Sequence, residues 1–203
     1  MKERILVTGG TGYIGSHTVV ELQNSGYDVV IVDNLSNSSA DVVDNIEKVS
    51  GIRPAFEKLD CLDLEGMDKL FTKYPGIKGI IHFAASKAVG ESVQKPLLYY
   101  RNNLVSLINL LELMPKHGVE GIIFSSSCTV YGQPDVLPVT EEAPIKKAES
   151  PYGNTKQINE EIIRDTVASG SPINAIMLRY FNPIGAHPTA LIGELPNGVP
   201  QNL

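Results

Sequence analysis

The amino-acid sequence predicts an α/β fold in which helices cover both faces of a doubly wound parallel sheet. One observation is that short apolar runs alternate with longer amphipathic stretches from residue 4 to residue 180. A second is a glycine-rich turn, residues 9–15, between the first apolar run and the first amphipathic stretch. Strands that alternate with helices form βαβ units, and the strands of such units run parallel.

Each apolar run is short and mostly β-branched, which is typical of a buried parallel strand. The expected strands are 4–8, 28–33, 55–59, 77–84, 121–126 and 173–180. The stretches between them are expected to be helices at 13–25, 39–50, 63–74, 97–117 and 151–169. Residues 133–150 are expected to form a long loop. We assign residues 1–182 to one domain and 183–203 to the start of a second, substrate-binding lobe.

Composition narrows the functional class. The 203 residues are 42% hydrophobic and 20% charged, with a net charge of −6 and no basic stripe, which argues against a nucleic-acid-binding protein. Two cysteines, Cys61 and Cys128, do not suggest a disulfide framework, and the four histidines have no metal-ligand spacing. With no signal peptide and no membrane-length apolar stretch in this sequence, we expect a cytoplasmic protein without a bound metal.

The glycine-rich turn predicts a dinucleotide site. Gly9 or Gly10 permits the tight turn, Gly12 admits the pyrophosphate close to the backbone, and Gly15 allows the helix to pack closely. Asp33 ends the second expected strand, where a carboxylate binds ribose hydroxyls and repels a 2′-phosphate. The pattern therefore predicts a Rossmann-type site for NAD rather than NADP.

Further cofactor contacts are expected where other strands end. Asp60 is a candidate for the adenine, although a solvated loop carboxylate is the alternative. Lys87 is expected to face phosphate or substrate, unless it is an ordinary exposed lysine, and Asn102 is a candidate hydrogen-bonding residue inside a helix. The remaining expected cofactor contacts are Tyr13, Ile14, Asn34, Cys61, Phe83, Ala84, Ala85, Ser125 and Tyr180.

The spacing of Tyr152 and Lys156 predicts a site for proton transfer. The two residues lie one helical turn apart, so a positive charge next to the phenol would lower the pKa of Tyr152 and prepare it as a base. A serine run, 125–127, ends the fifth expected strand, and we choose Ser127 as the partner of the reacting oxygen. A buried tyrosine with an exposed lysine is the alternative interpretation.

These motifs together resemble the extended short-chain dehydrogenase/reductase family. The glycine turn, Ser127 and the Tyr152–Lys156 pair carry that resemblance. Further strings resemble the branch of the family that epimerises UDP-hexoses: residues 7–17, 82–85, 87–92, 125–127, 129–132 and 178–183. The resemblance extends through the whole chain.

The resemblance implies epimerisation at C4 of a UDP-hexose through a 4-keto intermediate. Tyr152 would take the proton from the 4-hydroxyl while NAD takes the hydride, Ser127 would shuttle the proton, and Lys156 would hold the ribose and tune Tyr152. Substrate contacts are implied for Lys87, Ser127, Tyr152, Asn182, Asn202 and Leu203. A homodimer is implied for the full-length form.

Two alternatives stay open. Sugar-nucleotide dehydratases carry an Asp-Glu pair where this chain has Cys128 and Thr129, and related decarboxylases keep a glutamate at the second of these positions, so plain epimerisation is favoured. The other alternative is an NAD-binding fragment without catalysis, because the family's enzymes are longer. On that reasoning we expect these residues alone to turn over UDP-sugars poorly and to expose apolar surface.

Overall fold

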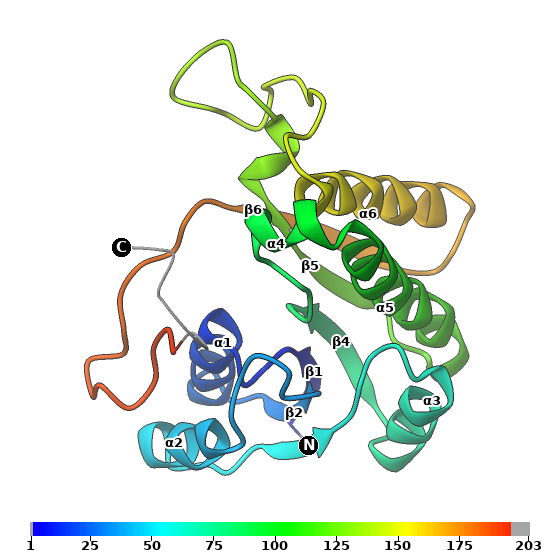
Figure 1. The fold of residues 1–203 in the computed structure, drawn as a ribbon. Helices are drawn as coiled ribbons and strands as arrows, with labels where there is room; N and C mark the ends of the chain where they lie inside the picture. Colours follow the sequence, from blue (N-terminus) through cyan, green and yellow to red (C-terminus); the bar gives the residue numbers. More distant parts are fainter. Residues whose placement is uncertain (1, 196–203) are drawn as a thin grey trace.

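The computed structural model describes residues 2–195, which contain a six-stranded sheet in the order β3-β2-β1-β4-β5-β6 (Figure 1). The strands are β1 Arg4–Thr8, β2 Asp28–Asp33, β3 Ala55–Lys58, β4 Ile77–His82, β5 Gly121–Ser127 and β6 Asn174–Tyr180. Every neighbouring pair is parallel. The order reverses direction between β1 and β4, and ligands of such sheets bind at that point, beyond the carboxyl ends of the strands. The predicted fold class is confirmed.

Helices lie on both faces of this sheet, with α1 and α2 on one side and α3, α5 and α6 on the other (Figure 1). Their bounds are α1 Tyr13–Asn24, α2 Asp41–Ser50, α3 Leu64–Lys73, α4 Val89–Gln94, α5 Pro96–His117 and α6 Pro151–Ala168. A short 3₁₀ helix, η1, spans Cys128–Tyr131 directly after β5.

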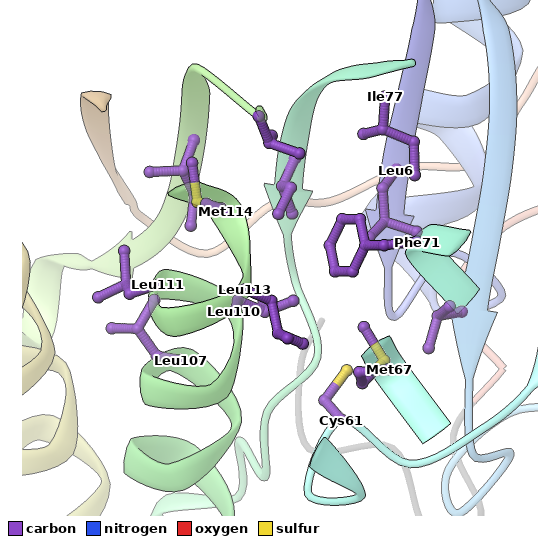
Figure 2. Close-up of a cluster of buried hydrophobic side chains, with 14 of the residues drawn as sticks. Leu6, Cys61, Met67, Phe71, Ile77, Leu107, Leu110, Leu111, Leu113 and Met114 are labelled. Atoms are coloured by element: carbon purple, nitrogen blue, oxygen red, sulfur yellow. The ribbon is translucent and has the colours of Figure 1, made fainter. Parts of the chain in front are cut away.

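Two hydrophobic clusters, one on each face, hold the layers together. Successive strand residues alternate between them because side chains of a strand point to opposite faces: Leu6 joins the α3–α5 side and Val7 the α1–α2 side. Figure 2 shows the larger cluster, where Met67 and Phe71 of α3 and Leu110 of α5 lie among strand residues.

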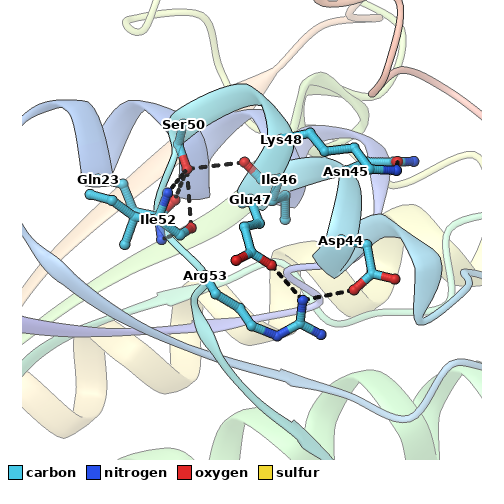
Figure 3. Close-up of polar contacts among 9 residues, drawn as sticks. All are labelled: Gln23, Asp44, Asn45, Ile46, Glu47, Lys48, Ser50, Ile52 and Arg53. Carbon is cyan, nitrogen blue, oxygen red and sulfur yellow. Dashed lines mark hydrogen bonds and ion pairs between the residues drawn. The ribbon is translucent and has the colours of Figure 1, made fainter.

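Helix α2 is tied to α1 through polar contacts at its end (Figure 3). The buried Gln23 side chain accepts a 2.8 Å hydrogen bond from Ser50 and donates one of 3.0 Å to the carbonyl of Ile52. Arg53 bridges Asp44 at 2.8 Å and Glu47 at 2.6 Å, but these exposed ion pairs add little stability.

Several elements differ from the expectations, among them η1, which was not predicted, and α2, which begins at Asp41, two residues later than expected. Helix α4 was not predicted; six residues give too little periodicity, and its position depends on Tyr99, whose hydroxyl accepts from the amide of Ala88 at 3.1 Å and donates to Glu91 at 2.9 Å. Strand β4 ends at His82, two residues earlier than predicted. Residues 133–150 form the expected loop without a helix or strand.

The segment after β6 contains a single isolated bridge, between Ala186 and Gly193, within the residues that the structure describes. Asn202 and Leu203, predicted to contact substrate, lie outside the described residues. The proposed boundary at residue 182 stays a prediction. Within residues 2–195, no helix is both long and apolar enough to cross a membrane.

Candidate functional site

The predicted site residues that the structure describes gather along the carboxyl edge of the sheet. The glycine turn follows β1, Asp33 ends β2, Asp60 follows β3, Phe83 follows β4, Ser127 ends β5 and Tyr180 ends β6. The adjacent order of β1, β4 and β5 brings the predicted cofactor and proton-transfer residues side by side.

Glycine is required in the turn by close backbone contacts. Gly9 has a φ of +69°, and a Cβ there would lie 2.8 Å from the amide nitrogen of Ala84. A Cβ on Gly15 would lie 2.2 Å from the carbonyl oxygen of Gly9, so the start of α1 rests directly on the turn. Gly12 is the N-cap of α1, and no side chain of residues 2–195 caps that helix. The first amides of α1 are therefore free of side-chain caps beside the turn.

Asp33 faces the glycine turn. One carboxylate oxygen accepts from the amide of Thr11 at 3.3 Å, and the other accepts from the amide of Leu35 at 2.9 Å and the hydroxyl of Ser38 at 3.1 Å. These bonds hold a negative charge next to the turn, as the sequence predicted.

Asn34 and Asp60 are brought together beyond β2 and β3. The side-chain amide of Asn34 donates to one carboxylate oxygen of Asp60 at 3.0 Å, and the backbone amide of Leu62 donates to the other at 2.9 Å. Cys61 differs: its thiol is buried in the larger hydrophobic cluster, and burial raises its pKa to about 12. The Cys61 side chain is thus a core residue, and any ligand contact would have to come from its backbone.

The end of β4 is locked to β1. The amide of Phe83 donates to the carbonyl of Thr8 at 3.0 Å, while the Thr8 hydroxyl bonds the ring of His82 at 2.7 Å. Burial, with the nearby charge of Lys156, lowers the pKa of His82 to about 3. His82 is therefore a neutral core histidine, hydrogen-bonded to Thr8.

Ser86 and Asn103 organise the loop between β4 and α4. Asn103 accepts from the amide of Ser86 at 2.8 Å, and donates to the Ser86 carbonyl at 3.0 Å and to the Thr155 hydroxyl at 3.1 Å. Asn102 donates to the Ser86 hydroxyl at 3.1 Å. Asn103 is not among the predicted site residues, although an asparagine in a helix interior was a signal that could have identified it.

Lys87 and the chain beyond β6 lie at the open side of the site. Lys87 is exposed and forms an ion pair with Glu194 at 3.1 Å, and its expected contact with phosphate or substrate stays a prediction. The hydroxyl of Tyr13 donates to the carbonyl of Gly185 at 2.7 Å, and Tyr13 and Ile14 line a pocket with residues 183–186. Asn182 is exposed at the start of this segment.

Lys156 is buried beneath the reactive edge. Its ammonium donates to the carbonyl of Ser125 at 2.7 Å and lies 4.8 Å from the centroid of the Phe124 ring. Burial lowers the pKa of Lys156 to about 8. The alternative of an exposed lysine is wrong.

Tyr152 lies one turn before Lys156 in α6, whose first turn is capped by the Ser150 hydroxyl, an acceptor for the amide of Gly153 at 3.1 Å. Burial raises the pKa of Tyr152, and a hydrogen bond with Ser127 opposes that rise. We expected Lys156 to lower the pKa of Tyr152, but in this structure the net direction is upward. The physical reason is that the effect of burial on the Tyr152 pKa outweighs that of the bond with Ser127. The Lys156 ammonium lies 5.7 Å from the Tyr152 ring centroid and donates its hydrogen bond to the Ser125 carbonyl instead.

Tyr180 closes the edge at β6. Its ring lies 6.4 Å from that of Phe83, centroid to centroid, and burial raises its pKa. Ala84 and Ala85 follow Phe83 with partly exposed side chains. Residues 2–195 hold no group of three or more His, Cys, Asp and Glu side chains suited to a metal ion.

Comparisons with known proteins agree with a nucleotide-binding site at the carboxyl edge of this α/β sheet. The model of the NAD dependent epimerase/dehydratase family matches residues 5–199. The chain belongs to the NAD dependent epimerase/dehydratase family.

Relatives within this family are similar along nearly all of the chain. The UDP-glucose 4-epimerase of Bacillus subtilis is 53% identical over 98% of this chain, and the human enzyme of the same name is 49% identical over 100%. These alignments cover 58% and 60% of the relatives, so the chain spans a little over half their length.

Solved structures give the same result for the fold. The UDP-glucose 4-epimerase of Bifidobacterium longum, in complex with NAD⁺ and UDP, superposes with a TM-score of 0.95 at 48% identity, covering 98% of this chain and 59% of that one. A UDP-glucose 4-epimerase from Stenotrophomonas maltophila with bound NAD also gives 0.95 at 49% identity, covering 99% and 59%.

Proposed function

We propose that this chain binds NAD and supplies the proton-transfer residues of a UDP-hexose 4-epimerase, the activity belonging to the whole protein. The observation that carries the proposal is the juxtaposition, on one edge of the sheet, of the glycine turn with Ser127, Tyr152 and Lys156. The similar proteins are UDP-glucose 4-epimerases, one of them solved in complex with NAD⁺ and UDP, which supports a UDP-hexose as the substrate and NAD as the cofactor.

The residues present fit a dinucleotide. The bare backbone of the turn leaves room where a Cβ would otherwise stand, and the free amides at the start of α1 suit a pyrophosphate. Asp33 would accept hydrogen bonds from the adenosine ribose and would repel a 2′-phosphate. Asn34 and Asp60 would meet the adenosine end, and Phe83, Ala84, Ala85 and Tyr180 would line the opposite end. When bound, NAD⁺ supplies a hydride acceptor that can return the hydride.

Tyr152 is proposed to take the proton of the sugar 4-hydroxyl and to give it back after C4 has inverted. The Ser127 hydroxyl would bond the same oxygen and relay the proton, which agrees with its opposing the rise that burial causes in the pKa of Tyr152. Lys156, buried and attached to β5, would hold a ribose hydroxyl of the cofactor.

Substrate contacts beyond the reacting carbon are proposed for Lys87, Asn182, Asn202 and Leu203. Lys87 would exchange its ion pair with Glu194 for a phosphate, and Asn182 is exposed at the strand end where a diphosphate would pass. Cys128 and Thr129 stand where an eliminating enzyme would need an acid, which supports epimerisation.

The proposal is tested by measuring the NAD content and mass of the purified chain, followed by an assay of UDP-galactose conversion to UDP-glucose in the whole protein. Bound NAD together with C4 inversion is the expected result. Conversion to a dehydrated or decarboxylated sugar nucleotide, or the absence of any dinucleotide binding, would contradict it.

A homodimer of the whole protein and a cytoplasmic location are also proposed. Exposed apolar side chains on α4 and α5 support association: Val93, Leu97, Leu98, Val105 and Ile108. Sedimentation of the whole protein tests the dimer, and a monomeric mass at micromolar concentration would contradict it.

A further inference from the structure

Glu160 is a fully buried carboxylate on α6 that the proposed chemistry does not use. It lies one turn beyond Lys156 and two turns beyond Tyr152, and its side chain is 0% exposed. An unpaired carboxylate in this position would be very costly, so its partners must be placed accurately.

Four donors meet the two oxygens of Glu160. One oxygen accepts from the Ser126 hydroxyl at 2.6 Å and from Nε of Arg179 at 2.9 Å. The other accepts from a terminal nitrogen of Arg179 at 2.7 Å and from Arg164 at 2.6 Å. Burial alone would raise the pKa of Glu160, but the bonds from Arg179 and Ser126 outweigh it and the pKa is lowered. Glu160 is therefore charged and fully hydrogen-bonded.

Two hydrogen bonds connect one face of α6 to the end of β5: Lys156 donates to the carbonyl of Ser125, and Glu160 accepts from the hydroxyl of Ser126. Ser127 is the next residue of β5, and its side chain opposes the rise that burial causes in the pKa of Tyr152, one turn before Lys156. Successive turns of the helix thus lie along the end of the strand.

Arg179 extends the attachment to the other side of Ser127. It lies opposite Ser126 in the β5–β6 ladder and donates to the hydroxyl of Tyr131 at 2.9 Å. Tyr131 belongs to η1, which starts immediately after Ser127. Ser127 is consequently held from the residue before it and from the turn after it.

We propose that Glu160 and Arg179 are positioning residues that fix Ser127 in its place beside Tyr152. This inference rests on the proposed function, in which Ser127 and Tyr152 move the proton. Neither Glu160 nor Arg179 is given a contact with substrate or cofactor; both act through Ser126 and Tyr131.

The test follows the titration of Tyr152 in the purified chain without dinucleotide, by NMR of ¹³C-labelled tyrosine. The Tyr152→Phe variant assigns the signal, and Ser127→Ala defines the effect of losing the serine completely. In Glu160→Gln we expect the phenolate fraction of Tyr152 at a given pH to fall roughly threefold to tenfold, toward the Ser127→Ala result, because the bond from Ser127 weakens. Glu161→Gln, an exposed neighbour on the same helix, should leave the titration unchanged.

The sign of the change separates positioning from other roles. Loss of the negative charge of Glu160 would by itself increase the phenolate fraction of Tyr152, which is opposite to the decrease expected from a weakened bond with Ser127. An unchanged titration, with only stability reduced, would mean that Glu160 is merely structural. Either of these results would overturn the inference.

If Glu160→Gln does not fold, Ser126→Ala decides by the same criteria, because it removes one bond and leaves the Glu160–Arg179 pair intact. The proposed function fails separately, through absent NAD binding or through full turnover of Tyr152→Phe in the whole protein.

Discussion

Lys156 donates a 2.7 Å hydrogen bond to the backbone carbonyl of Ser125, rather than directing its ammonium at the phenol of Tyr152. The bond ties α6 to the end of β5 in a buried setting. Lys156 thus has a structural attachment in addition to its proposed role toward the ribose. That arrangement has consequences for the pH dependence of stability.

The stability of the chain is expected to rise between about pH 8 and pH 9.5. Burial lowers the folded pKa of Lys156 from its ordinary value of 10.5 to about 8, so in this window the unfolded chain binds the proton more tightly. The cost of burying the charged Lys156 is fully present below pH 8, and its relief as pH rises contributes about 1–2 kcal/mol over the window. The buried Cys61 thiol, whose pKa is raised from 9.0 to about 12, offsets part of this gain above about pH 9, so the Lys156 contribution is taken as the difference between the chain and Lys156→Met. Urea unfolding at several pH values measures it.

Lys156→Met should remove this rise, whereas Lys147→Met, at an exposed loop position, should retain it. Measurements should stop below pH 10. The pKa of the buried Tyr99 is raised to about 12 in the folded chain, so above pH 10 the tyrosines of the unfolded chain ionise first and the stability of the fold decreases. A parallel rise in the chain and in Lys156→Met would show that another group is responsible.

Gly15→Ala should destabilise the turn and abolish dinucleotide binding. The new Cβ would lie 2.2 Å from the Gly9 carbonyl, and backbone on both sides must move to accept it. We expect a loss of at least about 1–3 kcal/mol of unfolding free energy. Thermal unfolding and NAD titration measure the two effects.

Gly90→Ala is the matched control, because a Cβ there meets nothing within 4 Å and the residue lies in α4. It should leave NAD binding unaltered and be neutral or stabilising by up to about 1 kcal/mol. Equal tolerance at both positions would disprove the packing argument for Gly15.

Tyr152→Phe should lower turnover of a UDP-hexose in the whole protein by at least about 10²–10⁴-fold, the usual contribution of general acid–base catalysis. The fold and NAD affinity should persist, since the phenol ring that packs at the site remains. Steady-state kinetics with circular dichroism and NAD titration provide the measurement. Near-normal turnover would identify a different base.

The strands with uninterrupted apolar runs, such as Arg4–Thr8 and Asp28–Asp33, could be predicted from the sequence, and so could the glycine turn and the position of Asp33 beside it. Local chemistry determines these features. Helix α4 was missed because Tyr99, a neighbour from the next helix, secures it. Glu160 was missed because its partners, Ser126 and Arg179, come from different strands, and a helix sequence alone does not reveal that a glutamate is buried. The pKa direction of Tyr152 was wrong because burial depends on the packed structure.

A calorimetric titration of the purified chain with NAD and with NADP tests the proposed dinucleotide site most directly when it is repeated on Asp33→Ala and on Asp165→Ala, an exposed control at the far end of α6. We expect tighter binding of NAD than of NADP by the unmodified chain and by Asp165→Ala. In Asp33→Ala, NAD should bind more weakly and the preference should shrink, because the ribose acceptor and the repelling charge are lost. Tighter binding of NADP than NAD by the unmodified chain would contradict the proposed site.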